Sequence, residues 1–324
     1  MSKKIFIFLV LILFSIFFIS ESQVNVINIW GPATPTSIPL VIAAQNLPNT
    51  KINIFTDHSQ ASALFLKGET QILFTGLDVG IAFFKNNTPV VMLNSYVTGL
   101  TYLVTYGMKV NSFKELKGKS IYIPFEGSPI EEIVKFFVEK DRLVYKKDIT
   151  PIYAPFASSF ELLKQGKVEV VALPEPFVTM SSSIPNVFVS FGFKDYYEKL
   201  TGKKNGYPQV GGFAMKSWAI NNIDYIKLLH SELAKAIELI KKDPNQAVKI
   251  AAPYFKFPEP VLLKALSNTT FSLSYSTDLL NEVFSYYQTI VDEYQKRIPV
   301  CYNILASVDD IVLKKPEGAF YLVV

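Results

Sequence analysis

Two kinds of apolar segment alternate along residues 24–218, and this alternation limits the chain to few fold classes. Short segments rich in Val, Ile and Phe, such as residues 24–30 and 51–55, indicate strands. Longer segments with helical spacing lie between them, and one ends at Gly68, which suits a left-handed helix cap. Strands that alternate with helices of this length predict an α/β fold with a largely parallel sheet.

The middle of the chain repeats the plan of its beginning. Segments 64–76 and 162–176 align on Gly68 and Gly166, and each contains a helix, a glycine, a polar step and a strand. This internal similarity predicts two similar α/β halves. Further strands are predicted at residues 71–74, 90–93, 120–123, 149–153 and 169–173, and helices at residues 37–44, 59–68, 77–84, 127–141 and 158–166.

The last third of the chain changes to a helical pattern, with Leu229, Leu233 and Ile237 on one stripe. No strand is predicted after Trp218, so these helices are expected to cover the sheet of the first half. The predicted lobes are therefore residues 23–100 with 210–324, and residues 101–209. Gly211 and Gly212 suit a flexing crossover between the lobes, and a cleft between lobes is a natural ligand site.

The amino terminus has the pattern of a secretory signal peptide over residues 1–22. Lys3 and Lys4 precede an apolar stretch, residues 5–19, and small residues stand at the −3 and −1 positions of a cleavage point after Ser22. The stretch is shorter than the ~20 residues of a spanning helix, so retention as an N-terminal anchor is the second alternative. We therefore expect an exported protein of the periplasm or extracytoplasmic space.

Composition excludes several other classes of protein. The single cysteine, Cys301, excludes a disulfide-stapled scaffold. The net charge of +4 is too small to indicate a nucleic-acid-binding protein. Nucleotide-binding glycine loops, serine-hydrolase motifs and metal-ligand spacings are missing from the sequence, so we expect no enzyme, catalytic residue, metal or cofactor.

Several short motifs follow one another in the order known from one family of proteins. Lys67–Ile72 resembles its "GEID" step, residues 88–91 its "G-x-P-V" strand, and residues 112–121 its "DLKGKxI" segment. Residues 126–129 resemble its "GS" helix start, and residues 170–177 its "A-x-x-EP" turn. Asn87 and Thr88 depart from this pattern, because glycine is commoner there. Over residues 24–300, the chain resembles the ABC-importer solute-binding proteins for nitrate, sulfonates, taurine and thiamine-pyrimidine precursors.

The resemblance implies a periplasmic-binding-protein fold of type II, with two lobes and a hinge. It also implies a monomer that captures a small molecule between the lobes and delivers it to a permease and its ATP-binding subunits. A binding protein that serves a sensory receptor is an alternative. A cytoplasmic biosynthetic enzyme of the same fold, for a thiamine-pyrimidine or menaquinone precursor, is a further alternative that the signal peptide disfavours.

Ligands of open α/β sheets bind beyond the carboxyl ends of strands, near helix amino termini. Backbone N–H groups at Thr75, Gly76, Gly127 and Ser128 are expected to face the ligand. Candidate binding residues on such loops are Trp30, Thr34, His58, Thr75, Gly76, Asp78, Asn94, Tyr96, Gly127, Ser128, Phe156, Glu175 and Gly211. Structural roles are the alternative for several of them: helix caps for Ser128 and Asp78, and core packing for Trp30.

Charge in these loops favours one class of ligand. The chain has only two arginines, Arg142 and Arg297, and no Arg or Lys lies in a candidate loop. Four carboxylates do, namely Asp57, Asp78, Glu126 and Glu175. We therefore expect a neutral or cationic heterocycle such as an aminopyrimidine, with a sulfonate or nitrate held by helix amino termini as the alternative.

Overall fold

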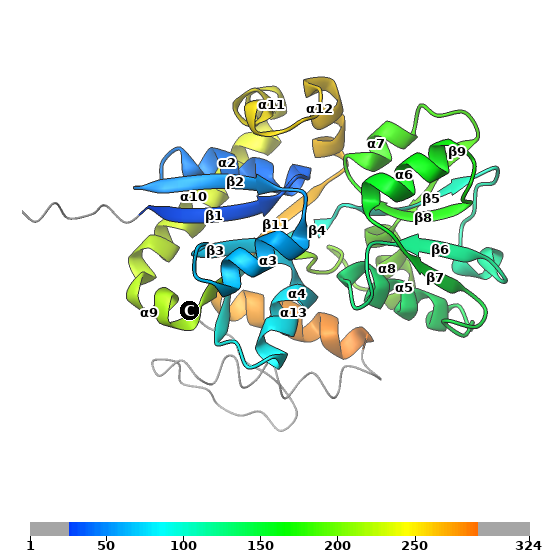
Figure 1. Cartoon of the computed structure of the whole chain (residues 1–324), viewed down its shortest axis with the longest axis horizontal. Coiled ribbons are helices and arrows are strands. Elements are labelled where there is room, and N and C mark those ends of the chain that lie inside the picture. The colour runs from blue at the N-terminus through cyan, green and yellow to red at the C-terminus, as the bar shows by residue number, and fades with distance from the viewer. Residues whose placement is uncertain (1–25, 291–324) are drawn as a thin grey trace, which may run out of the picture.

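The computed structural model describes residues 26–290, which form two lobes, each built on its own sheet (Figure 1). The first lobe has a six-stranded sheet in the order β11-β4-β10-β3-β1-β2. Its strands are β1 (Ile27–Pro32), β2 (Thr50–Phe55), β3 (Ile72–Gly76), β4 (Val90–Gly99), β10 (Val210–Met215) and β11 (Thr270–Ser274). The predicted signal peptide, Cys301, Arg297 and the end of the chain lie outside the described residues.

The second lobe has a five-stranded sheet in the order β7-β6-β8-β5-β9. Its strands are β5 (Thr101–Tyr106), β6 (Ser120–Ile123), β7 (Thr150–Tyr153), β8 (Val170–Pro174) and β9 (Val187–Gly192). The two sheets correspond strand for strand, because β2-β1-β3-β10-β4 of the first matches β7-β6-β8-β5-β9 of the second. Segments 64–76 and 162–176 end in the corresponding strands β3 and β8, so the predicted internal similarity is confirmed. Gly68 and Gly166 both have positive φ values, 78° and 67°, as left-handed caps require.

Both sheets are mixed, so the prediction of a largely parallel sheet is wrong in part. Strand β1 pairs in parallel with β2 and β3, and β6 with β7 and β8. Strand β10 runs antiparallel to β3 and β4, and β5 antiparallel to β8 and β9. The antiparallel pairs arise where the chain passes from one lobe to the other, because β5 and β10 each follow directly after such a crossing.

Strand β11 contradicts the expectation that no strand follows Trp218. It pairs with β4 at the edge of the first sheet, and its residues are only partly buried. Its sequence, TFSLS, is short and half polar, so its apolar pattern is weak beside the long helices around it. The chain therefore returns to the first sheet twice, once through β10 and once through β11.

Helices cover both faces of each sheet, and each lobe has its core on both sides of its strands (Figure 1). In the first lobe these are α2 (Ile38–Ala44), α10 (Ile223–Lys242), α11 (Pro244–Ala251) and α12 (Glu259–Ser267) on one face, and α3 (His58–Leu66), α4 (Leu77–Lys85) and α13 (Ser276–Ile290) on the other. In the second lobe they are α5 (Pro129–Lys140) and α8 (Phe193–Thr201) on one face, and α6 (Phe156–Lys164) and α7 (Phe177–Ser181) on the other. Shorter elements are η1 (Pro35–Ser37), η2 (Phe113–Leu116), α9 (Lys216–Asn221) and η3 (Ala252–Tyr254).

Aromatic side chains join the two lobes at the second crossing of the chain, residues 202–209. Tyr207 stacks on Tyr286 of α13 with ring centroids 5.2 Å apart, and Tyr197 of α8 lies 5.1 Å from Tyr207. All three side chains are buried. Over residues 26–290, no helix is long and apolar enough to cross a membrane.

Candidate ligand-binding site

A cavity of about 100 Å³, partly open to solvent, lies between the two sheets. It lies beyond the carboxyl ends of β1, β3, β6 and β8, where the starts of α3, α4, α5 and α6 also meet. Both crossings of the chain border it as well. Its lining residues are Pro32, Thr34, His58, Thr75, Gly76, Val79, Leu100, Thr101, Pro124, Phe125, Ser128, Pro129, Ile130, Phe156, Pro174, Tyr207, Gln209 and Val210.

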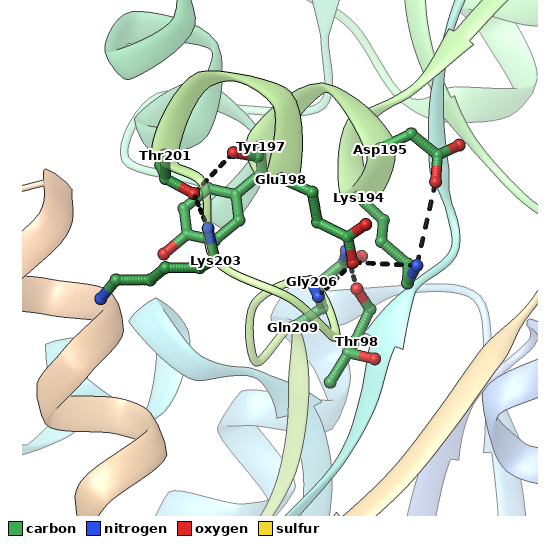
Figure 2. A network of polar contacts seen from close by, with 9 residues as sticks. All are labelled: Thr98, Lys194, Asp195, Tyr197, Glu198, Thr201, Lys203, Gly206 and Gln209. Atoms are coloured by element: carbon green, nitrogen blue, oxygen red, sulfur yellow. Dashed lines mark hydrogen bonds and ion pairs between the residues drawn. The ribbon is translucent and has the colours of Figure 1, made fainter.

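The second crossing of the chain, residues 202–209, is held in place from the second lobe. Glu198 of α8 accepts a hydrogen bond from the Gly206 N–H at 2.8 Å and forms an ion pair with Lys194 at 3.0 Å (Figure 2). Burial raises the pKa of Glu198, but Lys194 and the Gly206 N–H outweigh this effect and hold the pKa below its ordinary value. Glu198 is therefore a charged anchor for the crossing.

The same crossing is also fastened to the first lobe. Lys203 extends toward α13, where its Nζ donates to the Ser285 carbonyl at 2.7 Å (Figure 2). Gln209 Nε2 donates to the carbonyl of Thr98 at the end of β4, at 3.2 Å, and this contact joins the two crossings. The segment that borders the cavity is thus tied to both lobes.

Six of the residues predicted from the sequence line the cavity. Thr34, His58, Thr75 and Gly76 come from the first lobe, and Ser128 and Phe156 come from the second. The rule that ligands bind at the carboxyl ends of strands locates all six. Their role in binding stays a prediction.

Seven predicted residues do not line the cavity, contrary to expectation, and two of these lie inside β4. Tyr96 is fully buried, and its hydroxyl donates to the Thr36 carbonyl at 3.0 Å. Asn94 is also fully buried, and its Oδ1 accepts from the Gly212 N–H at 3.2 Å. The sequence predicts a strand ending at Leu93, whereas β4 continues to Gly99 and carries both side chains into the core.

The two predicted carboxylates are buried in structural contacts. Asp78 accepts a hydrogen bond from the Tyr287 hydroxyl at 2.9 Å. Glu175 is fully buried, where its Oε1 accepts from Asn268 Nδ2 at 2.7 Å and its Oε2 from the Thr179 N–H at 3.0 Å. Since Asn268 follows α12 of the first lobe, Glu175 links the lobes outside the cavity.

The remaining three predicted residues are a tryptophan and two glycines. Trp30 stacks on Phe55 at 6.5 Å and packs against the core. Gly127 has a φ of 74° and borders a separate hollow on the second lobe. Gly211 lies against β4, where a Cβ would clash with the Asn94 carbonyl. Strand pairing and turn geometry account for both glycines.

Sequence reasoning missed the lining residues that come from the crossings, including Thr101, Tyr207 and Gln209. These residues lie in or beside strands that were not predicted. The rule that ligands bind at the carboxyl ends of predicted strands therefore did not locate them. Prolines mark part of this site in the sequence. Pro32, Pro124 and Pro174 each stand at or just after the carboxyl end of a strand, and all three line the cavity.

No Asp, Glu, Lys or Arg is among the residues that line the cavity, within residues 26–290. The described residues that line the cavity therefore do not form the electronegative cleft that the sequence predicted. Asp57 borders an adjoining hollow that shares His58, Phe125 and Phe156 with the cavity, and its carboxylate accepts hydrogen bonds from the N–H groups of Ser59 and Gln60. Glu126 pairs with Lys146 at 3.0 Å. The lining polar groups are hydroxyls, the Gln209 amide and the His58 imidazole.

His58 is the cavity residue whose ordinary pKa lies nearest neutrality. Burial lowers the pKa of His58, and this effect outweighs the opposite influence of Asp57. Its ring lies edge-on to Phe55 at 5.0 Å and faces Phe125 of the second lobe at 6.2 Å. The imidazole is therefore neutral near pH 7, in a wall shared by the two lobes. No group of three or more His, Cys, Asp or Glu residues suited to a metal ion occurs in the described part of the chain.

No protein-family model and no curated protein sequence matches the chain. Solved structures do match the chain. The periplasmic aliphatic sulphonate binding protein SsuA from Escherichia coli matches with a TM-score of 0.68 and 19% identity, over 84% of this chain and 87% of that one. The ligand binding component of an ABC-type import system from Staphylococcus aureus, with zinc bound, matches with a TM-score of 0.67 and 13% identity, over 84% and 91%.

The periplasmic nitrate-binding protein NrtA from Synechocystis PCC 6803 matches with a TM-score of 0.64 and 13% identity, over 89% of this chain and 84% of that one. These similarities define the class of fold. The chain has the type II periplasmic-binding-protein fold, with two lobes and a hinge, as the sequence motifs implied.

Proposed function

We propose that this protein is an extracytoplasmic solute-binding protein that captures an uncharged small molecule between its lobes for an ABC importer. One observation carries this proposal: a single cavity has lining residues from both sheets and from both crossings. Movement of the lobes about the crossings opens such a cavity, and ligand contacts to both lobes favour closure. The lobes in this proposal are residues 23–100 with 210–324, and residues 101–209.

The fold and the amino-terminal sequence support the same function. The similar structures include binding components of import systems. The pattern of residues 1–22 suits export, with cleavage or retention as an anchor. The proposed partners are a permease and its ATP-binding subunits, and the proposed state is a monomer without catalytic residues.

The lining of the cavity favours an uncharged ligand. A buried charge needs a partner of opposite charge, and none of the lining side chains provides one at pH 7. This removes the reason to expect a cationic ligand. A neutral planar heterocycle, including a neutral pyrimidine, fits better, because Phe156 and Phe125 offer ring faces and the hydroxyls of Thr75 and Ser128 offer hydrogen bonds.

A small anion is the second candidate, and one observation favours it. Helices α4 and α6 begin at the cavity, and neither Gly76 nor Pro155 at their N-cap positions provides a side-chain hydrogen bond to the first turn. Backbone N–H groups at such ends bind sulfonates and nitrate without a formal charge. The proteins named for sulphonate and nitrate among the similar structures agree with this alternative.

Melting curves with a panel of compounds test the proposal. The panel contains neutral pyrimidines and purines, alkanesulfonates, nitrate and amino acids. At ~100 times its Kd, a ligand stabilises the native state by ~2.7 kcal/mol, or roughly 4 °C in a protein of this size. We expect such a shift with a neutral heterocycle and no turnover of it. Stabilisation by anions alone supports the second candidate, and turnover contradicts both.

Replacement of Phe156 by alanine is expected to weaken binding of the stabilising compound by about tenfold or more, because an aromatic contact is worth ~1.5 kcal/mol. Phe188→Ala is the matched control, since Phe188 is exposed on β9 of the same lobe and does not line the cavity. Isothermal titration of both variants measures the effect. Equal affinities for the two variants would place the ligand elsewhere.

A further inference from the structure

Gly76 and Pro129, one from each lobe, contact each other in the wall of the cavity. Gly76 ends β3 of the first lobe, Pro129 begins α5 of the second, and both line the cavity. A Cβ atom on Gly76 would lie 2.5 Å from Pro129 Cγ, which is closer than real Cβ contacts. The two lobes therefore touch at this point because residue 76 has no side chain.

The backbone at Gly76 does not itself require glycine. Its φ and ψ values, −63° and 146°, lie in the extended region that all residues adopt. Residue 76 is also the N-cap of α4, a position where Ser, Thr, Asp or Asn stabilises a helix better than glycine. The close approach of Pro129 is thus the structural feature at this position that requires a missing side chain.

The structure around the contact leaves little freedom on either side. Gly76 is paired with Val210 of β10 within the first sheet. Pro129 stands in the first turn of α5, whose start is fixed by Ser128, since Ser128 Oγ accepts the Glu131 N–H at 3.1 Å. A proline ring has almost no conformational freedom. The contact therefore joins two rigid elements, unlike the neighbouring contact between the rings of His58 and Phe125.

We propose that the contact between Gly76 and Pro129 is the steric stop for lobe closure and so limits the size of the ligand. This inference rests on the proposed function. A side chain at position 76 would hold the lobes about 1 Å further apart, since an ordinary contact begins at 3.4 Å. A compact uncharged molecule that contacts both lobes at the stop would then lose contacts on one side. A bulkier analogue of the same class would hold the lobes apart, so the lobes could not close to the stop around it and would make fewer contacts with it.

A double-mutant cycle tests the stop in the full chain. Gly76→Ala places the new methyl group against Pro129 Cγ, and Pro129→Ala removes the atom that it strikes. We expect Gly76→Ala to lower Tm by several degrees, Pro129→Ala to change it little, and the double variant to recover most of the loss. This measurement needs no ligand. Additive effects on Tm would overturn the proposed contact.

Binding measurements on the same variants test the limit on ligand size. With the compound that stabilises the wild-type protein most, we expect Gly76→Ala to weaken binding at least tenfold and the double variant to restore it. Unchanged binding by Gly76→Ala would overturn the role in selecting ligands. If the cycle is coupled in Tm but no compound binds, the stop stands and the proposed function fails.

Discussion

Replacement of Asn268 by alanine is expected to lower the free energy of unfolding by about 2 kcal/mol at pH 7. Asn268 is the side-chain donor that reaches the fully buried Glu175 carboxylate, at 2.7 Å, from the opposite lobe. Without it, Glu175 keeps the Thr179 N–H as a partner, but one oxygen of a buried charge loses its hydrogen bond. Chemical unfolding at pH 7 measures the loss.

The loss should depend on pH in a defined direction. Burial raises the pKa of Glu175, while Asn268 and Thr179 partly oppose this effect. A raised pKa in the folded state means that protonation favours folding, so the variant should regain stability as the pH falls through that pKa. Ser267→Ala is the control, because its exposed hydroxyl bonds only the Lys264 carbonyl in the same helix. An Asn268→Ala variant as stable as Ser267→Ala would contradict the inter-lobe link.

Protonation of His230 is expected to destabilise the protein by up to about 3 kcal/mol as the pH falls from 6.5 to 4. Burial lowers the pKa of His230 from 6.5 to about 4, although a hydrogen bond to the Leu93 backbone acts in the opposite direction. Its Nε2 is buried and has no hydrogen-bond partner. Because the unfolded state binds the proton more readily, stability is complete above pH 6.5 and is lost below it.

His230→Phe provides the comparison, since it keeps a ring that can stack on Tyr275, 4.6 Å away in the native protein. The free energy of unfolding of both proteins is measured across this pH range. The wild-type curve should fall more steeply than that of the variant, and the difference should be complete near pH 4. Parallel curves would show that His230 does not carry the acid sensitivity.

The repeated helix and strand pattern was predictable because each element has a local signal. Glycine caps at Gly68 and Gly166 and the strands after them were located from the sequence, and so was the similarity of the two halves. Strands β5, β9, β10 and β11 were not predicted, and Gly211 and Gly212, expected in a flexing crossover, lie within β10. Each of these strands lies at or near the edge of a sheet or follows a crossing. Its position therefore depends on pairing with a segment distant in the chain rather than on a local periodicity of its residues.

The residues of the candidate site divide in the same way, into those with a local sequence signal and those whose position depends on distant contacts. Thr75, Gly76 and Ser128 were predicted because they lie at or near the junction of a strand and the helix that follows it, which is a local pattern. Glu175 also follows a strand, but its direction is set by Asn268, which lies 93 residues further along the chain. The electronegative cleft failed as a prediction for this reason, since a sequence shows where a carboxylate lies along the chain but not what it contacts.

The central claim is that one small molecule binds between the lobes and contacts both. Mapping of backbone amide chemical shifts at saturation with the most stabilising compound tests it directly. We predict the largest changes at Thr75 and Gly76 of the first lobe and, in the same titration, at Ser128 and Phe156 of the second. Changes confined to one lobe, or to surfaces away from these four residues, would contradict it.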